Sequence, residues 1–188
     1  MSVISMSKVI IFPTDTVYGI GTPIYDLDGI EKIYNIKSRV KDKPLACLCA
    51  NIEQIKDIAI VDENAKKLIM KFLPGCLTII LKAKDKVVET IGYKTIGVRI
   101  PNHKLALEIL EDNGPMLTTS VNDSGETPLN NYAEIFVKYN HLVDAIYYSD
   151  IPSSNLSSTV VKIIDDEVNV LREGHISEED IVKEINNV

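Results

Sequence analysis

The chain has 188 residues, a length typical of one domain that is large enough to bury a core. Its composition, 45% hydrophobic and 25% charged, is that of an ordinary globular protein, and no apolar run approaches the roughly 20 residues of a membrane helix. A net charge of −7 argues against a generic nucleic-acid coat protein, which would be basic overall.

The N-terminal sequence, MSVISMSKVIIF, lacks the basic segment, long apolar stretch and small-residue cleavage site of a signal peptide. The chain has three cysteines, and two of them, Cys47 and Cys49, lie in the apolar run PLACLCA. We therefore expect reduced core thiols, Cys76 included, in a cytoplasmic protein rather than a disulfide framework. We also expect residues 1–188 to form a single domain without a C-terminal extension domain.

Apolar runs and helical spacing predict alternating strands and helices. Residues 8–12 are expected to form a buried first strand, and residues 26–37 a helix capped by Asp26. The later predicted strands are 44–50, 76–83, 95–101, 115–122, 158–164 and 169–173. The later predicted helices are 51–59, 62–73, 102–114 with Asn102 as its cap, about 131–139, and 177–188. This alternation favours an α/β domain with a mixed sheet, because some strands are too close in the chain for a crossover helix.

The predicted strand 115–122 has one wholly polar face. Strand alternation places Thr118, Ser120 and Asn122 on the same side of the sheet. A solvent-facing strand would more often carry Lys and Glu, so these small hydroxyl and amide groups favour a wall that faces a polar ligand. A water-facing strand end is the alternative.

Arginine is rare, with three residues against 17 lysines. Its planar fork suits bidentate contacts with carboxylate or phosphate, which makes Arg39, Arg99 and Arg172 candidates for a site; chance is the alternative. In the strand 95–101, Arg99 shares one face with Thr95 and Gly97. Glycine at that place would leave room for a ligand to approach the backbone.

Four of the 20 basic residues lie between positions 37 and 43, a cluster that would attract an anion. Lys37 and Arg39 would project together if the chain leaves the preceding helix in an extended conformation; a charged helix end is the alternative. The sequence contains no HxxxH or CxxC metal spacing, no GxSxG, no GxxxxGK[ST] and no GxGxxG. Nucleotide recognition would therefore need separate Lys, Arg and hydroxyl groups.

Seven segments together resemble one known family. They read PTDTVYGIG, KSR followed by KDKPL, LPGCLTIIL, TIGVRIPNH, TTSVNDSGETP, SSTVV and LREGHI, in this order between about residues 8 and 176. On these segments the chain is similar to the YrdC/TsaC family of threonylcarbamoyl-AMP synthases (L-threonylcarbamoyladenylate synthases). Each segment is weakly specific alone, but seven in the family's order and spacing are specific.

The resemblance implies a fold and a reaction. The fold would be a single α/β domain, YrdC-like, whose twisted mixed sheet and flanking helices surround a concave, positively charged cavity. The reaction would convert L-threonine, bicarbonate and ATP, with Mg2+, into threonylcarbamoyl-AMP and pyrophosphate. Partner proteins of tRNA modification would transfer the threonylcarbamoyl group to an adenosine beside the anticodon; weak tRNA binding is left open.

The resemblance also implies roles for the matching residues. The family's Lys-x-Arg and Ser-x-Asn pairs correspond to the catalytic candidates Lys37, Arg39, Ser120 and Asn122. The threonine site would contain Thr14, Tyr18, Arg99, Thr118 and Ser158. The ATP site would contain Lys37, Thr95, Ser120 and Arg172. No metal ligand is predicted from the matching residues; Asp15 is a candidate ligand for Mg2+ only.

The segment IFPTDTVYGIG, residues 11–21, then has a physical interpretation. The turn after the first strand would present backbone N–H groups and Thr14 to the amino acid, and Tyr18 would form a cavity wall. Gly19 and Gly21 would let the chain bend tightly around both. Arg99 would clamp the threonine carboxylate through a bidentate pair.

Four residues depart from the family's usual pattern. Val40, Cys76 and Glu173 stand where Pro is usual, and Val121 replaces Ala. None of these changes removes a charged or hydroxyl group from the expected site, although the Glu173 carboxylate would compete with phosphate beside Arg172.

Three other functions are alternatives to the synthase. The first is a YciO-like protein, which the segments YKTIGVRIP and REG resemble. The second is an RNA-binding module on the same fold, which would need aromatic residues among the basic cluster, where none occurs. The third is a carbamoyl transfer as in hydrogenase-maturation proteins, whose additional regions do not fit in 188 residues.

Overall fold

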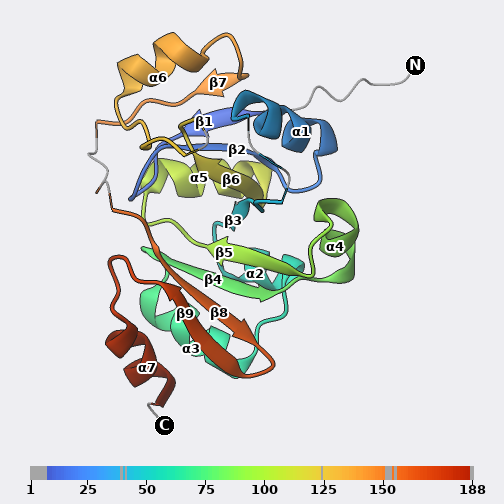
Figure 1. The fold of residues 1–188 in the computed structure, drawn as a ribbon, viewed down its shortest axis with the longest axis vertical. Helices are drawn as coiled ribbons and strands as arrows, with labels where there is room; N and C mark the ends of the chain where they lie inside the picture. Colours follow the sequence, from blue (N-terminus) through green and yellow to red (C-terminus); the bar gives the residue numbers. More distant parts are fainter. Residues whose placement is uncertain are drawn as a thin grey trace.

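Nine strands of the described chain form one twisted mixed sheet, with helices packed around it (Figure 1). The computed structural model describes residues 8–38, 40, 42–123, 125–150, 154 and 156–186. The strands are β1 (Ile10–Phe12), β2 (Gly19–Pro23), β3 (Ala46–Leu48), β4 (Leu77–Lys82), β5 (Thr95–Arg99), β6 (Met116–Ser120), β7 (Ala145–Ile146), β8 (Thr159–Ile164) and β9 (Glu167–Arg172). The helices are α1 (Leu27–Ile36), α2 (Ile52–Ile58), α3 (Glu63–Phe72), α4 (Asp85–Ile91), α5 (Lys104–Asn113), α6 (Tyr132–Tyr139) and α7 (Glu178–Asn186).

The strand order is β7-β1-β2-β6-β3-β5-β4-β8-β9. Three pairs, β1 with β7, β3 with β5 and β4 with β8, are parallel, and the other pairs are antiparallel. The predicted mixed α/β sheet is therefore confirmed. The order places β5 and β6 on either side of the short strand β3, so the two strands with predicted polar faces lie close together.

Most predicted elements are confirmed, including the helix caps Asp26, Asn51 and Asp62, whose side chains accept backbone N–H groups of the first turn. Three elements were not predicted: β2, α4 and the two-residue strand β7. The predicted cap of α5 is wrong by one residue, because His103 rather than Asn102 holds the N-cap position. Of the described helices, none is long and apolar enough to cross a membrane.

The glycines of β2 are needed for packing and not for bending. Gly19 and Gly21 lie inside the strand and pair with Ser120 and Thr118 of β6. A Cβ atom would lie 2.6 Å from Thr118 Cγ2 if added at Gly19, and 2.8 Å from Thr118 Oγ1 if added at Gly21. The predicted tight bend at these glycines is therefore wrong: their missing side chains make room for Thr118.

Strand β1 is buried on both faces of the sheet. Ile10 and Phe12 pack in an apolar cluster with residues of α5. Val9 and Ile11 point to the opposite face, as strand alternation requires, and join the larger cluster that includes residues of α2 and α3. The polar turn after β1 thus follows directly on a fully buried strand.

Candidate functional site

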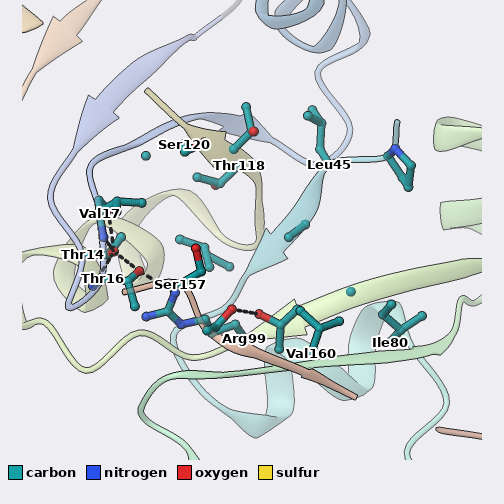
Figure 2. A pocket seen from close by; sticks show the side chains of 18 of the residues that line it. Thr14, Thr16, Val17, Leu45, Ile80, Arg99, Thr118, Ser120, Ser157 and Val160 are labelled. Atoms are coloured by element: carbon teal, nitrogen blue, oxygen red, sulfur yellow. Dashed lines mark hydrogen bonds between the residues drawn. The ribbon is translucent and has the colours of Figure 1, made fainter. Parts of the chain in front are cut away.

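A cavity of about 390 Å3 opens where segments far apart in the sequence meet (Figure 2). Its walls come from the turn after β1, residues 44–48, strands β4, β5 and β6, and the C-terminal segment from Ser157 to Arg172. Among the described lining residues, the charged ones are Arg99 and Arg172. The predicted positive charge of the cavity as a whole stays a prediction.

Most of the predicted site residues are brought together in this cavity. Those that line it are Thr14, Tyr18, Thr95, Arg99, Thr118, Ser120, Ser158 and Arg172. Lys37 and Asn122 are not among the described lining residues but contact Ser120 from within the protein. Arg39 lies outside the described residues.

The two polar strand faces meet as predicted. Thr95, Gly97 and Arg99 of β5 line the cavity, while Ile96 and Val98 are buried in the core. Figure 2 shows Thr118 and Ser120 of β6 across the cavity from Arg99. The alternation of strand side chains thus creates a polar wall on each side.

Lys37 is a buried ammonium group at the end of α1. It is the C-cap residue of the helix and only 2% exposed. Its Nζ donates to the Ser120 carbonyl oxygen at 2.5 Å, the Asn122 carbonyl oxygen at 2.6 Å and Asn122 Oδ1 at 3.0 Å. The backbone at Lys37 is helical and Ser38 has a φ of 47°, so these two residues do not form the extended exit that would make Lys37 and Arg39 project together.

The Ser-x-Asn pair is tied into the same network. Ser120 Oγ donates to Asn122 Oδ1 at 2.6 Å, and Asn122 Nδ2 donates to the carbonyl oxygens of Asp123 and Glu126. Asn122 therefore orients Ser120 at the cavity surface and holds the loop that follows β6. The Lys37 ammonium group and the Ser120 hydroxyl both donate to Asn122 Oδ1.

Arg99 is held by three protein groups. Its Nε donates to the Gly75 carbonyl oxygen at 2.9 Å and its Nη1 to Thr16 Oγ1 at 2.8 Å, while Nη2 pairs with Asp15 Oδ1. The residue is 6% exposed, so its orientation toward the cavity is fixed before any ligand binds.

Cys76 contacts the other oxygen of the Asp15 carboxylate, with Sγ 3.3 Å from Oδ2. Burial, followed by the neighbouring Asp15 charge, raises the pKa of the Cys76 thiol to about 11. Cys47 and Cys49 are buried in the core, as predicted. The core prediction is wrong for Cys76, which is half buried beside the cavity.

The turn after β1 is organised by the Thr14 hydroxyl. Thr14 Oγ1 donates to the Val17 carbonyl oxygen at 2.7 Å, and the N–H groups of Thr16 and Val17 approach it at 3.2 and 3.3 Å. These two N–H groups point at Thr14 itself and do not face the cavity, so the predicted presentation of backbone N–H groups to the amino acid stays a prediction for the other residues of the turn. Thr14 lines the cavity, as predicted.

Tyr18 forms part of the cavity wall. It is 3% exposed, and its hydroxyl oxygen accepts the Ser149 N–H at 3.3 Å. Burial raises the pKa of the Tyr18 phenol, which therefore stays neutral and supplies a flat, uncharged surface.

Arg172 reaches the cavity from β9. Its Nε and Nη2 donate to the Ser158 carbonyl oxygen at 3.2 and 2.9 Å, and the Ser158 hydroxyl lies 2.8 Å from Thr78 Oγ1. The neighbouring Glu173 carboxylate instead accepts the Glu178 N–H at the start of α7. The Glu173 carboxylate thus contacts that helix end, and its competition with phosphate beside Arg172 stays a prediction.

Two cavity-lining hydroxyl side chains that contact predicted site residues were missed by sequence reasoning. Thr78 lines the cavity from β4, and the alternation rule applied to Thr78 and Ile80 would have found it. Thr16 lines the cavity and accepts from Arg99, a contact between residues 83 positions apart that no local pattern reveals.

A magnesium centre built by the protein does not fit these residues. In the described ranges, no three His, Cys, Asp or Glu side chains gather as a metal site. Asp15, held in reserve for Mg2+, is engaged by Arg99 and Cys76. A requirement for Mg2+ therefore stays a prediction.

Comparison with known proteins gives a consistent assignment. The family model described as "Telomere recombination", of the Sua5, YciO and YrdC proteins, matches residues 2–174. A putative threonylcarbamoyl-AMP synthase of Methanocaldococcus jannaschii is 39% identical over 90% of this chain and 81% of its own length. The threonylcarbamoyl-AMP synthase of Bacillus subtilis is 34% identical over 93% of this chain and 52% of its own length.

Solved structures agree with this fold. Pyrococcus abyssi Sua5 complexed with L-threonine has a TM-score of 0.86 and 30% identity, covering 95% of this chain and 54% of that one. Escherichia coli YciO has a TM-score of 0.83 and 29% identity, and the match covers 93% of this chain and 87% of the YciO chain. The chain thus spans about half of the Bacillus and Pyrococcus proteins and most of the other two.

Proposed function

Because this chain belongs to the Sua5/YciO/YrdC family, we propose that it is a threonylcarbamoyl-AMP synthase. This nucleotidyltransferase would convert L-threonine, bicarbonate and ATP into threonylcarbamoyl-AMP and pyrophosphate for tRNA modification. The observation that carries the proposal is the convergence of two arginines and ten hydroxyl-bearing residues on one cavity, in a family with named synthases.

The amino-acid end of the cavity lies around Arg99. Its guanidinium group would bind the threonine carboxylate, because Arg and carboxylate form strong paired hydrogen bonds. The hydroxyl groups of Thr14, Thr118 and Ser158 would complete the threonine site, with Tyr18 as a wall. A relative of this fold has been solved with L-threonine, which supports the choice of substrate.

The nucleotide end lies around Arg172, with Thr95 and Ser120 as further contacts. Arg172 would pair with phosphate oxygens. The Lys37 ammonium, buried behind Ser120, would act on the phosphates through its charge, and Arg39 keeps its predicted catalytic role.

The reaction then needs no side-chain nucleophile. The threonine amine attacks the carbon of bicarbonate, with loss of water, or of CO2, with loss of a proton, to form a carbamate. A carbamate oxygen attacks the α-phosphorus of ATP, the bond to the β-phosphate oxygen breaks, and pyrophosphate leaves. Catalysis would come from holding three small reactants together and from cationic groups that offset the developing charge at phosphorus.

The test is a pyrophosphate-release assay on the purified protein. We expect release only when L-threonine, bicarbonate and ATP are all present, with threonylcarbamoyl-AMP identified by mass spectrometry and L-serine as the control amino acid. Pyrophosphate formed equally well without threonine or bicarbonate would contradict the proposal.

The YciO-like alternative rests on a weaker sequence similarity, 30% identity against 39% for the first synthase relative, and predicts no threonine-dependent turnover in this assay. The RNA-binding alternative predicts RNA affinity that falls steeply with salt, without binding of threonine or ATP. Titration of all three ligands separates these alternatives from the synthase.

A further inference from the structure

A buried carboxylate neutralises the arginine at the amino-acid end of the cavity. Asp15 pairs with Arg99 Nη2, and their side chains are 13% and 7% exposed. Thr14 and Thr16, on either side of Asp15 in the chain, line the cavity, whereas Asp15 is not among its described lining residues. Asp15 thus touches the guanidinium group without being part of the cavity wall.

The carboxylate is held on both oxygens. Oδ1 accepts from Arg99, and Oδ2 lies 3.3 Å from the Cys76 thiol. The backbone carbonyl oxygen of Asp15 also accepts the Ser154 N–H at 3.4 Å. A ligand carboxylate that approaches Arg99 therefore meets an ion pair whose net charge is zero, with a fixed negative charge behind it.

We propose that Asp15 is a specificity-determining residue that makes this end of the cavity select a zwitterionic amino acid over a simple carboxylate. The inference rests on the proposed function, which places the substrate carboxylate on Arg99. A monoanion bound there is repelled by Asp15, whereas the α-ammonium group of an amino acid compensates the extra negative charge of the bound ligand.

This interaction is strong because the Asp15–Arg99 pair is largely shielded from solvent. Charges that are a few ångströms apart interact several times more strongly near protein than in bulk water. The Arg99 contacts with Thr16 and Gly75 leave the guanidinium little freedom to move away from Asp15. The geometry therefore gives selectivity for the α-ammonium group, which loses a proton to become the amine that attacks in the first step of the reaction.

The experiment compares two ligands by calorimetric titration: L-threonine and 3-hydroxybutanoate, which is threonine without its amino group. Asp15→Asn removes the charge but keeps the size and an oxygen acceptor. We expect its preference for threonine over 3-hydroxybutanoate to fall by about tenfold, mainly because the anion binds more tightly to the uncompensated arginine. A merely structural Asp15 would weaken both ligands equally and leave the ratio unchanged, which would overturn the inference.

A second variant covers the case in which Asp15→Asn does not fold, since an unpaired buried charge is destabilising. Cys76→Lys keeps the Asp15–Arg99 pair and places an ammonium group near Asp15 Oδ2 from a half-buried position. Its preference for threonine should fall in the same direction. The matched control is Cys76→Ala, which changes no charge and should keep the wild-type ratio within about twofold.

The outcomes separate the two claims. If the wild-type protein does not bind threonine, the proposed function fails. If the wild-type protein binds threonine and a folded Asp15→Asn or Cys76→Lys variant keeps the wild-type ratio, the synthase proposal stands and the role of Asp15 is refuted.

Discussion

Lys37 was predicted from the sequence as a site residue, but its hydrogen-bond partners were not predicted. Its ammonium group has three donors, and three oxygens of Ser120 and Asn122 accept from it. Burying a charge is costly unless it is hydrogen-bonded. The first residue of the Lys-x-Arg pair thus hydrogen-bonds to both residues of the Ser-x-Asn pair, and these bonds connect the end of α1 to the end of β6.

We predict that Lys37→Met lowers the free energy of unfolding by about 2–4 kcal/mol, because buried oxygen acceptors are left without a donor. Turnover should fall as well, by roughly a hundredfold or more if its charge stabilises the transition state. Urea unfolding and the pyrophosphate assay measure the two effects separately.

Lys32→Met is the matched control for Lys37→Met on the same helix. Lys32 forms a half-exposed pair with Asp144 at 3.4 Å, so its loss should cost less than about 1 kcal/mol. Near-wild-type turnover of folded Lys37→Met would refute a catalytic role for the ammonium group.

At the scale of elements, caps and periodic helices were predictable because their signals lie within a few residues. Asp26, Asn51 and Asp62 each accept an N–H three residues later, as N-cap residues commonly do. Strand β2 was missed because GIGTP has weak strand propensity. It forms because β1 and β6 supply hydrogen bonds on both sides.

The start of α5 depends on a neutral histidine. His103 Nδ1 accepts the Ala106 N–H at 3.4 Å, and Nε2 lies 3.3 Å from Ser149 Oγ. Burial lowers the pKa of His103, although the nearby Asp15 charge acts in the opposite direction. A proton on Nδ1 would abolish the cap and place a positive charge at a helix N-terminus, which is unfavourable.

The stability of the protein should therefore fall as the pH drops below about 6.5, the ordinary pKa of histidine. Between that value and the lower folded-state pKa, the unfolded chain binds more protons than the folded one, so stability rises with pH. We expect the free energy of unfolding to decrease more steeply from pH 7.5 to 5.5 in the wild type than in His103→Asn, which keeps a cap but does not titrate. Parallel pH dependences in denaturant titrations would show that His103 makes no such contribution.

At the scale of the whole molecule, the cavity exists because the sheet order places β4, β5 and β6 near the turn after β1. Its ligands would contact segments from Thr14 to Arg172, and binding would therefore stabilise the entire folded domain. A ligand at about 100 times its dissociation constant stabilises the folded state by about 2.7 kcal/mol.

We thus predict that threonine and ATP together raise the midpoint of thermal unfolding by about 5–10 °C in a domain of this size. Differential scanning fluorimetry measures the shift, and L-serine with ATP is the control. An unchanged midpoint at saturating threonine and ATP would mean that these ligands do not bind the folded cavity.

The family resemblance pointed to eight of the residues that line the cavity, whereas the patterns of the sequence itself determined the α/β class, most helices and strands, and the two polar strand faces. These features depend on side-chain periodicity and on capping over short distances. Only the tertiary structure decided that β2 is a strand, that Lys37 lies behind Ser120, and that Asp15 neutralises Arg99. Lys37 is 83 and 85 positions from its partners Ser120 and Asn122, and Asp15 is 84 positions from Arg99. The energy of such a contact depends on burial and distance, which are set only when the sheet has assembled.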